Sequence, residues 1–222
     1  MTDDGAFRNT TFVVIDFEAT TPAGFPAQPV EVAVLALRYD GQWRETGRGT
    51  SLIRPPAFAP VTPAFTAQTG LTAEQLQAAP TPAEALAALD RRFAADTSYL
   101  LVAQHAATEA NLIYHQREHC PRLARIDLLD TIPLAKRCVP GLFNYRLDTL
   151  LAHFGIAQPA DRHRAPADVA VTAQLFRRLI ALADDNGEAD SLAGLVKIAG
   201  RTAQANAPVQ ERLFELSPPE AE

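Results

Sequence analysis

Residues 11–21 read TFVVIDFEATT, an apolar, β-branched and aromatic run that contains two acids, Asp16 and Glu18. A run of this kind predicts a buried strand. Side chains two residues apart on a strand share a face, so both carboxylates project together at its carboxyl end, where α/β sheets place their ligand sites. Two like charges this close repel each other, and a divalent cation relieves the repulsion. For this motif alone, the alternative is that the strand ends at the protein surface and that both acids are ordinary solvent-exposed residues.

Two further segments continue the strand pattern. Val30–Tyr39 (VEVAVLALRY) follows the first run through the loop Thr20–Pro29, and Trp43–Ile53 follows through the turn Asp40-Gly41. The connections are short, so the three strands are predicted to form an antiparallel meander.

The rest of the chain alternates between helix and strand patterns. Capping-box sequences begin at Thr72 and Thr81 and predict helix starts. Strands are predicted over residues 99–103 and 125–130, and helices over 108–119, 147–154, from about 167 onward, and over 192–205. The expected fold class is therefore three-layer α/β, with a mixed central sheet, the meander plus parallel strands, flanked by helices.

Length and composition limit the classes of protein to which this chain could belong. A chain of 222 residues suits one compact domain, and its two cysteines lack any framework spacing. With a polar N-terminus and no apolar stretch of membrane-spanning length, we expect a cytoplasmic protein that makes no membrane contact. The net charge is −6, but residues 122–178 carry nine basic and five acidic residues, which leaves one region locally basic. The sequence has no P-loop, no zinc-type cysteine pair and no nucleophile-elbow serine.

Two other acidic motifs lie far along the chain. In HRAPAD, Asp168 falls in the first turn of the last long helix and His163 in the loop before it. A near-neutral imidazole at such a position suits a general base. The alternative is an ordinary first-turn acid beside a surface histidine. Glu109 lies near the start of the predicted helix 108–119. The alternative for this residue is also an ordinary acid in the first turn of a helix.

The motifs VVIDFEATT (13–21), VAQHAATE (102–109) and HRAPAD (163–168) occur in the order found in a known family. Together they resemble the DEDDh 3′–5′ exonucleases, and the branch of the polymerase proofreading subunits looks most similar. The resemblance covers roughly residues 10–182 and implies an RNase H-like fold. We expect an exonuclease domain over residues 8–183, followed by a partly flexible C-terminal helical and acidic extension over 184–222.

The resemblance also implies a set of site residues. The acids Asp16, Glu18, Glu109 and Asp168 would bind two divalent cations, Mg²⁺ or Mn²⁺, and all four would take part in catalysis with His163 as the general base. The second motif departs from the family, which usually has aspartate where this chain has Glu109. For substrate binding, the candidates are Ala19, Thr20 and His105.

The implied activity is hydrolysis of phosphodiester bonds from a 3′ end, with release of nucleoside 5′-monophosphates. The expected substrate is single-stranded or 3′-end nucleic acid, DNA ahead of RNA. The expected partner is a DNA polymerase or another replication or repair protein, and a homodimer is a further assembly to test. Two alternatives stay open: a binding module that kept the fold but lost efficient catalysis, and an exoribonuclease acting on RNA or short oligomers.

Overall fold

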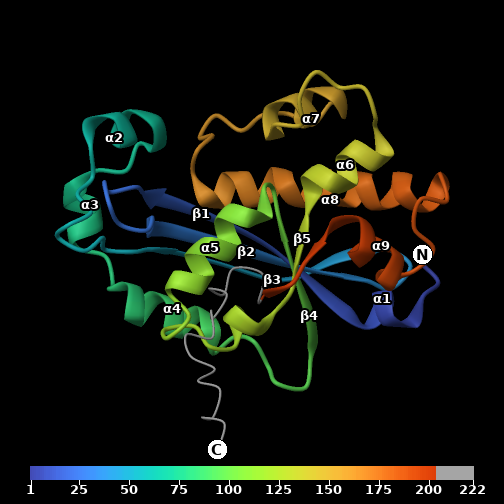
Figure 1. Cartoon of the computed structure of the whole chain (residues 1–222), viewed down its shortest axis with the longest axis horizontal. Helices are drawn as coiled ribbons and strands as arrows, with labels where there is room; N and C mark the ends of the chain where they lie inside the picture. The colour runs from blue at the N-terminus through green and yellow to red at the C-terminus, as the bar shows by residue number, and fades with distance from the viewer. Residues whose placement is uncertain (204–222) are drawn as a thin grey trace, which may run out of the picture.

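A computed structural model describes residues 1–203 and shows one central sheet with helices around it (Figure 1). In the described part of the chain the strand order is β3-β2-β1-β4-β5-β6. The strands are β1 (Thr10–Thr20), β2 (Gln28–Tyr39), β3 (Trp43–Leu52), β4 (Ser98–Ala103), β5 (Leu128–Asp130) and β6 (Gly200–Arg201).

The sheet is mixed, as predicted. Strands β1, β2 and β3 form the antiparallel meander, with Val14 opposite Leu35. On its other side β1 pairs in parallel with β4, where Val14 lies opposite Val102, and β4 pairs in parallel with β5. The carboxyl ends of the three parallel strands therefore meet at one edge of the sheet, which is where such folds place ligands.

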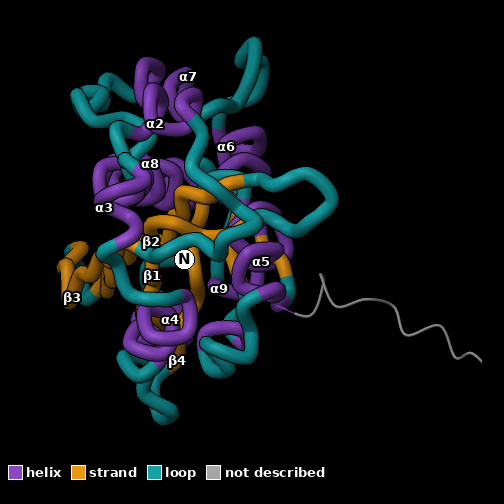
Figure 2. Tube along the Cα trace, turned by 90° about the vertical axis from the view of Figure 1, so that its left-hand side faces the viewer, coloured by secondary structure: helices purple, strands orange, loops and turns teal. Residues whose placement is uncertain are grey.

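Helices cover both faces of the sheet (Figures 1 and 2). The long helix α8 lies across one face, against β1 and β2, with α6 packed against it. On the opposite face, α4 and α5 share a core with β1 and β2. The helices are α1 (Gly5–Asn9), α2 (Pro63–Thr69), α3 (Ala73–Gln77), α4 (Pro82–Asp90), α5 (Ala106–His115), α6 (Thr131–Cys138), α7 (Leu147–His153), α8 (Ala165–Asp185) and α9 (Leu192–Ala199), with a 3₁₀ turn at Leu123–Arg125.

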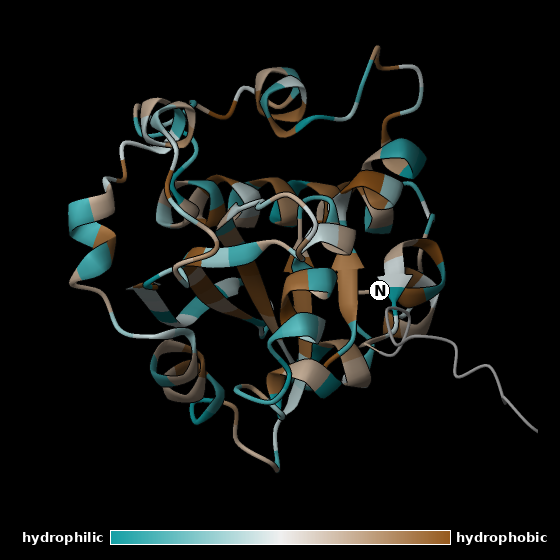
Figure 3. Cartoon of the chain, turned by 60° about the vertical axis from the view of Figure 1, so that its left-hand side comes forward, coloured by the Kyte–Doolittle hydropathy of each residue, from teal (hydrophilic) through white to brown (hydrophobic). Residues whose placement is uncertain are grey.

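The alternation along β1 decides where its acids point. Phe12 and Val14 pack in the core beneath α8, whereas Val13 and Ile15 pack in the core on the α4 and α5 side. Figure 3 shows hydrophobic residues concentrated in the strands between these two layers. Continuing the same alternation places Asp16 and Glu18 on the face that α8 covers.

Several element boundaries differ from the predictions because tertiary contacts set them. Helix α5 begins at Ala106, two residues early, since the Asp130 carboxylate accepts the backbone N–H groups of His105 (3.2 Å) and Ala106 (3.1 Å). Helix α8 begins at Ala165, whose N–H donates to Glu31 at 2.9 Å. Strand β5 is shorter than predicted because the 3₁₀ turn occupies the start of the segment.

The last described segment differs most from its prediction. The helix predicted over 192–205 ends at Ala199, and the next two residues form β6, which pairs antiparallel with β5. Helical periodicity carries no information about a two-residue strand that forms only against a distant edge. In addition, Leu195 and Ala199 lie in the same core as α8. The rest of the predicted C-terminal extension, residues 204–222, lies outside the described residues.

Within residues 1–203, no helix combines the length and the hydropathy that a membrane crossing requires.

A cluster of five aromatic rings joins the N-terminal helix, the meander and α8. Ring centroids lie 4.9 to 5.9 Å apart in tilted or edge-to-face pairs. Its members are Phe7, Phe12, Tyr39, Trp43 and Phe176. Aromatic pairs in these geometries add stabilisation beyond their buried area, so the cluster fixes α8 on the sheet.

Replacing Phe176, which is fully buried, should destabilise the fold strongly. Phe176→Ala is expected to lower the free energy of unfolding by about 3–5 kcal/mol through lost apolar contact and a residual cavity. Urea denaturation followed by the fluorescence of Trp43, the one tryptophan of the chain, measures the change. The control is Phe143→Ala, because Phe143 is 99% exposed and its loss should cost at most about 0.5 kcal/mol. Equal losses in the two variants would contradict this account of the core.

Candidate active site

Four acids that are distant in the sequence form what we call the acid cluster: Asp16, Glu18, Glu109 and Asp168. The first two lie partly buried near the carboxyl end of β1. Glu109 lies in the first turn of α5 and is 3% exposed, and Asp168 lies in the first turn of α8 and is 7% exposed. Two strand acids thus meet two helix acids at the edge where the parallel strands end.

The tightest grouping in the cluster includes the predicted histidine. Glu18, His163 and Asp168 each offer a ligand atom, and these atoms all lie within 4.8 Å of one another. Asp16 and Glu109 lie outside this group. They are close enough that the negative charge of Glu109 disfavours ionisation of Asp16 and raises its pKa. The structure therefore brings all five candidate residues into one region.

Burial and mutual repulsion perturb the acids strongly. Burial raises the pKa of Asp16 well above its ordinary value, and the charges of the other three acids raise it further. The pKa of Glu18 is raised to about 8, first by burial and then by the charge of Asp168. Glu109 also has a pKa of about 8, mainly because it is buried. Unless a divalent cation binds, the Glu18 and Glu109 carboxyl groups therefore hold their protons at neutral pH.

Glu109 supplies a test of whether a cation fits this region. Its Oε2 atom is buried and has no hydrogen-bond partner among residues 1–203. A buried carboxylate oxygen without a partner is costly, and hard divalent cations prefer carboxylate oxygens as ligands. The unpartnered oxygen and the grouping of Glu18, His163 and Asp168 therefore both fit a divalent cation.

His163 lies in a constrained loop before α8. Its φ of 64° is in the left-handed region, which is uncommon for a residue other than glycine. Its ring Nδ1 lies 3.3 Å from Nε2 of Gln68 on α2. If the Gln68 amide is turned so that its oxygen accepts from Nδ1–H, then Nε2 of the histidine keeps its lone pair for a proton.

An ion pair on the next residue anchors this loop. The Arg164 guanidinium donates from Nη2 to Glu31 Oε1 at 2.7 Å and from Nε to Glu31 Oε2 at 3.1 Å. Glu31 is 1% exposed and lies opposite Glu18 in the pairing of β1 and β2. The contact therefore ties the start of α8, and with it His163 and Asp168, to the sheet beside the acids.

Arg162, on the other side of His163, reaches into the acid cluster. It forms an ion pair with Asp168 through Nη1 and another with Asp148, on α7, through Nε at 2.8 Å. Its positive charge favours the ionised forms of Asp16 and Glu18, opposing the effect of burial.

The three predicted substrate-binding residues differ in their surroundings. Ala19 follows an irregularity in the pairing of β1 with β2, directly after Glu18. Thr20 is buried, and its hydroxyl donates to the Ala59 carbonyl at 3.4 Å, so this side chain serves loop packing. His105 is exposed, with φ 67° and its Nδ1 2.9 Å from Thr108 Oγ1. Their assignment to substrate binding stays a prediction.

Sequence patterns alone do not point to Gln68, Arg162, Arg164 or Asp148 as parts of this region. One signal was present for Glu31, which is a charged residue inside the apolar run VEVAVLALRY. An acid in a strand that is buried on both faces requires a cationic partner.

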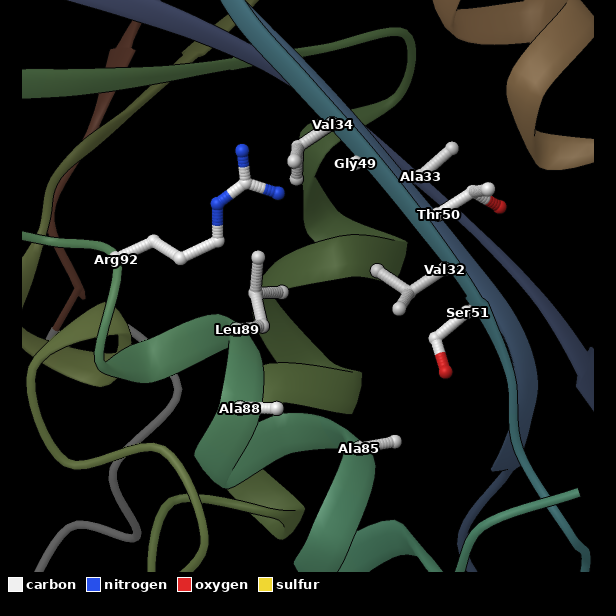
Figure 4. A pocket seen from close by; sticks show the side chains of 10 residues that line it. All are labelled: Val32, Ala33, Val34, Gly49, Thr50, Ser51, Ala85, Ala88, Leu89 and Arg92. Carbon is white, nitrogen blue, oxygen red and sulfur yellow. The ribbon is translucent and has the colours of Figure 1, made fainter.

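A separate hollow of about 190 Å³ lies between α4 and the strands β2 and β3 (Figure 4). Its lining is mostly apolar, with Arg92 beside it. Arg92 donates from Nη2 to the Arg48 carbonyl at 2.9 Å and lies directly against Gly49, where a Cβ would collide with the guanidinium. None of the acid cluster lines this hollow, so it is distinct from the candidate active site.

Comparisons with known proteins identify the family of this chain. The exonuclease family model RNase_T matches residues 13–176. The DNA polymerase III subunit epsilon of Aquifex aeolicus (strain VF5) is 31% identical over 172 residues, which cover 77% of this chain and 80% of that protein. The chain therefore belongs to the exonuclease family, and the resemblance to DEDDh exonucleases is confirmed.

Solved structures share the fold at lower identity. The nuclease domain of 3′hExo, a DEDDh family member bound to rAMP, superposes with a TM-score of 0.65 at 17% identity, covering 80% of this chain and 94% of that chain. Exonuclease X, in complex with 5′ overhanging duplex DNA, has a TM-score of 0.60 at 22% identity, covering 84% of this chain and 98% of that one. Both confirm the RNase H-like architecture.

The raised pKa values predict how the stability of the metal-free protein depends on pH. In the folded protein Glu18 and Glu109 keep their protons up to about pH 8, whereas in the unfolded chain they lose them near the ordinary value of 4.5. Over this interval the folded state binds more protons, so stability falls as pH rises and levels off above pH 8. Melting temperatures in EDTA from about pH 5 to 9 should show this decline, and Glu109→Gln should make it shallower. A variant slope equal to the wild-type slope would contradict the assignment to Glu109.

Proposed function

We propose that this protein is a metal-dependent 3′–5′ exonuclease that releases nucleoside 5′-monophosphates from the 3′ end of DNA. The main support is the convergence of the four acids and His163 at the carboxyl end of β1. Carboxylates in this number suit a two-metal phosphodiesterase. Family membership points to the same class of reaction.

Each residue has a proposed role. Asp16, Glu18, Glu109 and Asp168 would hold two divalent cations, Mg²⁺ or Mn²⁺, which when bound activate the attacking water and stabilise charge on the phosphate and the leaving oxygen. His163 accepts the proton of the attacking water at its free ring nitrogen. Arg164, through Glu31, keeps the loop that carries His163 in place.

An exposed aromatic pair near the end of β1 supports a single-stranded 3′ end as substrate. Phe25 and Phe58 are 55% and 48% exposed, and their ring centroids lie 4.7 Å apart. Phe25 belongs to the loop after β1, and the contact of Thr20 with Ala59 joins the loop of Phe58 to the same end of the strand. Bases of single strands stack on such rings at about 1–3 kcal/mol each.

The identity to a DNA polymerase III subunit epsilon favours DNA over RNA and a polymerase as partner. Digestion rates on single-stranded DNA, duplex DNA with a mismatched 3′ end and RNA measure the preference. Faster digestion of RNA would replace the DNA proposal with the exoribonuclease alternative.

Removing the central acid or the base should abolish or strongly reduce activity. Asp16→Ala should eliminate digestion of a 5′-labelled oligonucleotide in Mg²⁺ or Mn²⁺, and His163→Ala should slow it by about 10²–10⁴-fold, the usual contribution of general acid–base catalysis. EDTA should stop the wild-type reaction. His153→Ala is the matched control, because His153 is exposed on α7 and should be dispensable. Full activity in Asp16→Ala would rule out the proposed chemistry.

The glutamate at position 109 favours one rival, a nucleic-acid or polymerase-binding module with weak catalysis. Its side chain is one methylene longer than the family's aspartate, and a small misplacement of a catalytic group can cost about 100-fold in rate. Under the main proposal, wild-type protein digests the oligonucleotide, and Glu109→Asp changes the rate by adjusting the cation site. Binding without digestion by wild-type protein, together with digestion restored in Glu109→Asp, would identify the module instead.

A further inference from the structure

Arg162 connects an acid of the cluster with an acid outside it. Its Nη1 binds Asp168, which is buried in the first turn of α8, and its Nε binds Asp148 on α7 at 2.8 Å. The two acids differ in setting, because the side chain of Asp148 is 55% exposed whereas that of Asp168 is 10% exposed. The guanidinium itself is largely buried, with 18% of the side chain exposed.

The contact with Asp168 conflicts with cation binding at the same carboxylate. Asp168 belongs to the group whose ligand atoms lie within 4.8 Å of one another. A divalent cation binds carboxylate oxygens at about 2.0–2.6 Å. A guanidinium on the same carboxylate would then face a double positive charge at close range, and that repulsion is strong in a partly buried site. The guanidinium and the divalent cation therefore compete for Asp168.

The neighbouring residues allow Arg162 to leave without disturbing the loop. Arg164 holds the chain two residues later through its contacts with buried Glu31. Asp148 offers Arg162 a second anchor at the protein surface. The side chain can therefore turn away from Asp168 while His163 stays in place.

We propose that Arg162 is a resident counter-ion of the metal-free site, which competes with the divalent cation for Asp168 and is retained by Asp148 once displaced. This inference rests on the proposed function, because it takes Asp168 as a cation ligand. Arg162 is a positioning residue that acts through Asp168. The contact neutralises part of the negative charge of the acid cluster before a cation arrives and sets the cation concentration at which the site fills.

Mn²⁺ binding without nucleic acid tests this proposal by isothermal titration calorimetry on the full chain at fixed pH and salt. Arg162→Gln should tighten Mn²⁺ binding by about tenfold, in line with the loss of one charge-assisted competitor. Asp148→Asn should weaken it by about threefold, because Arg162 then has Asp168 as its only anchor. In the Arg162→Gln background, Asp148→Asn should have no effect.

The double variant separates competition from a general change of charge. If the effects came only from long-range electrostatics, Asp148→Asn would weaken binding equally with and without Arg162, and that result would overturn the proposal. Arg146→Gln removes an exposed positive charge near Asp148 and should leave the Mn²⁺ affinity within about twofold. Unchanged or weaker binding in Arg162→Gln would also overturn it.

Two further results keep the interpretation unambiguous. Arg162→Lys replaces Arg162→Gln as the test if the glutamine variant fails to fold. Lysine keeps the positive charge but lacks the planar fork that spans both acids, so this variant should still bind Mn²⁺ more tightly than wild type. Wild-type protein that binds no Mn²⁺ would refute the proposed function itself. If the wild-type protein binds Mn²⁺ and neither Arg162 substitution changes the affinity, only the counter-ion role is refuted.

Discussion

The ion pair between Glu31 and Arg164 is the contact on which the geometry of the candidate site depends. Glu31 lies on the strand next to Glu18 and is almost fully buried, so its charge requires a partner. That partner comes from the first residues before α8, and the same carboxylate also accepts the N–H of Ala165. One buried acid thus fixes where α8 begins, and with it the position of Asp168 and the left-handed backbone of His163.

A second constraint arises from the acids themselves. Four carboxyl groups are held together partly or fully buried, and the pKa values of three of them are raised. The fold tolerates this arrangement because strong packing elsewhere, including the aromatic cluster beneath α8, offsets the cost. Stored electrostatic repulsion of this kind is typical of sites that bind cations, since the ligand relieves it.

Much of the fold could be predicted from local patterns. Apolar, β-branched and aromatic runs identify β1 and β2, the short turn at Asp40-Gly41 implies their antiparallel meander with β3, and helical spacing identifies α7 and α8. Boundaries were less predictable, because distant side chains set them. Asp130 caps the start of α5 and Glu31 caps the start of α8, and neither contact leaves a trace in the sequence around the helix.

For the candidate site, the sequence by itself determined that Asp16 and Glu18 share a face and that Asp168 lies in a first helical turn, because both facts follow from the repeat of one element. Only the tertiary structure decided that Glu109 is buried with an unpartnered oxygen, that Arg162 rather than solvent meets Asp168, and that Gln68 reaches His163. These contacts join residues from different elements. Their partners are chosen by strand order, helix docking and loop closure, which no local periodicity encodes.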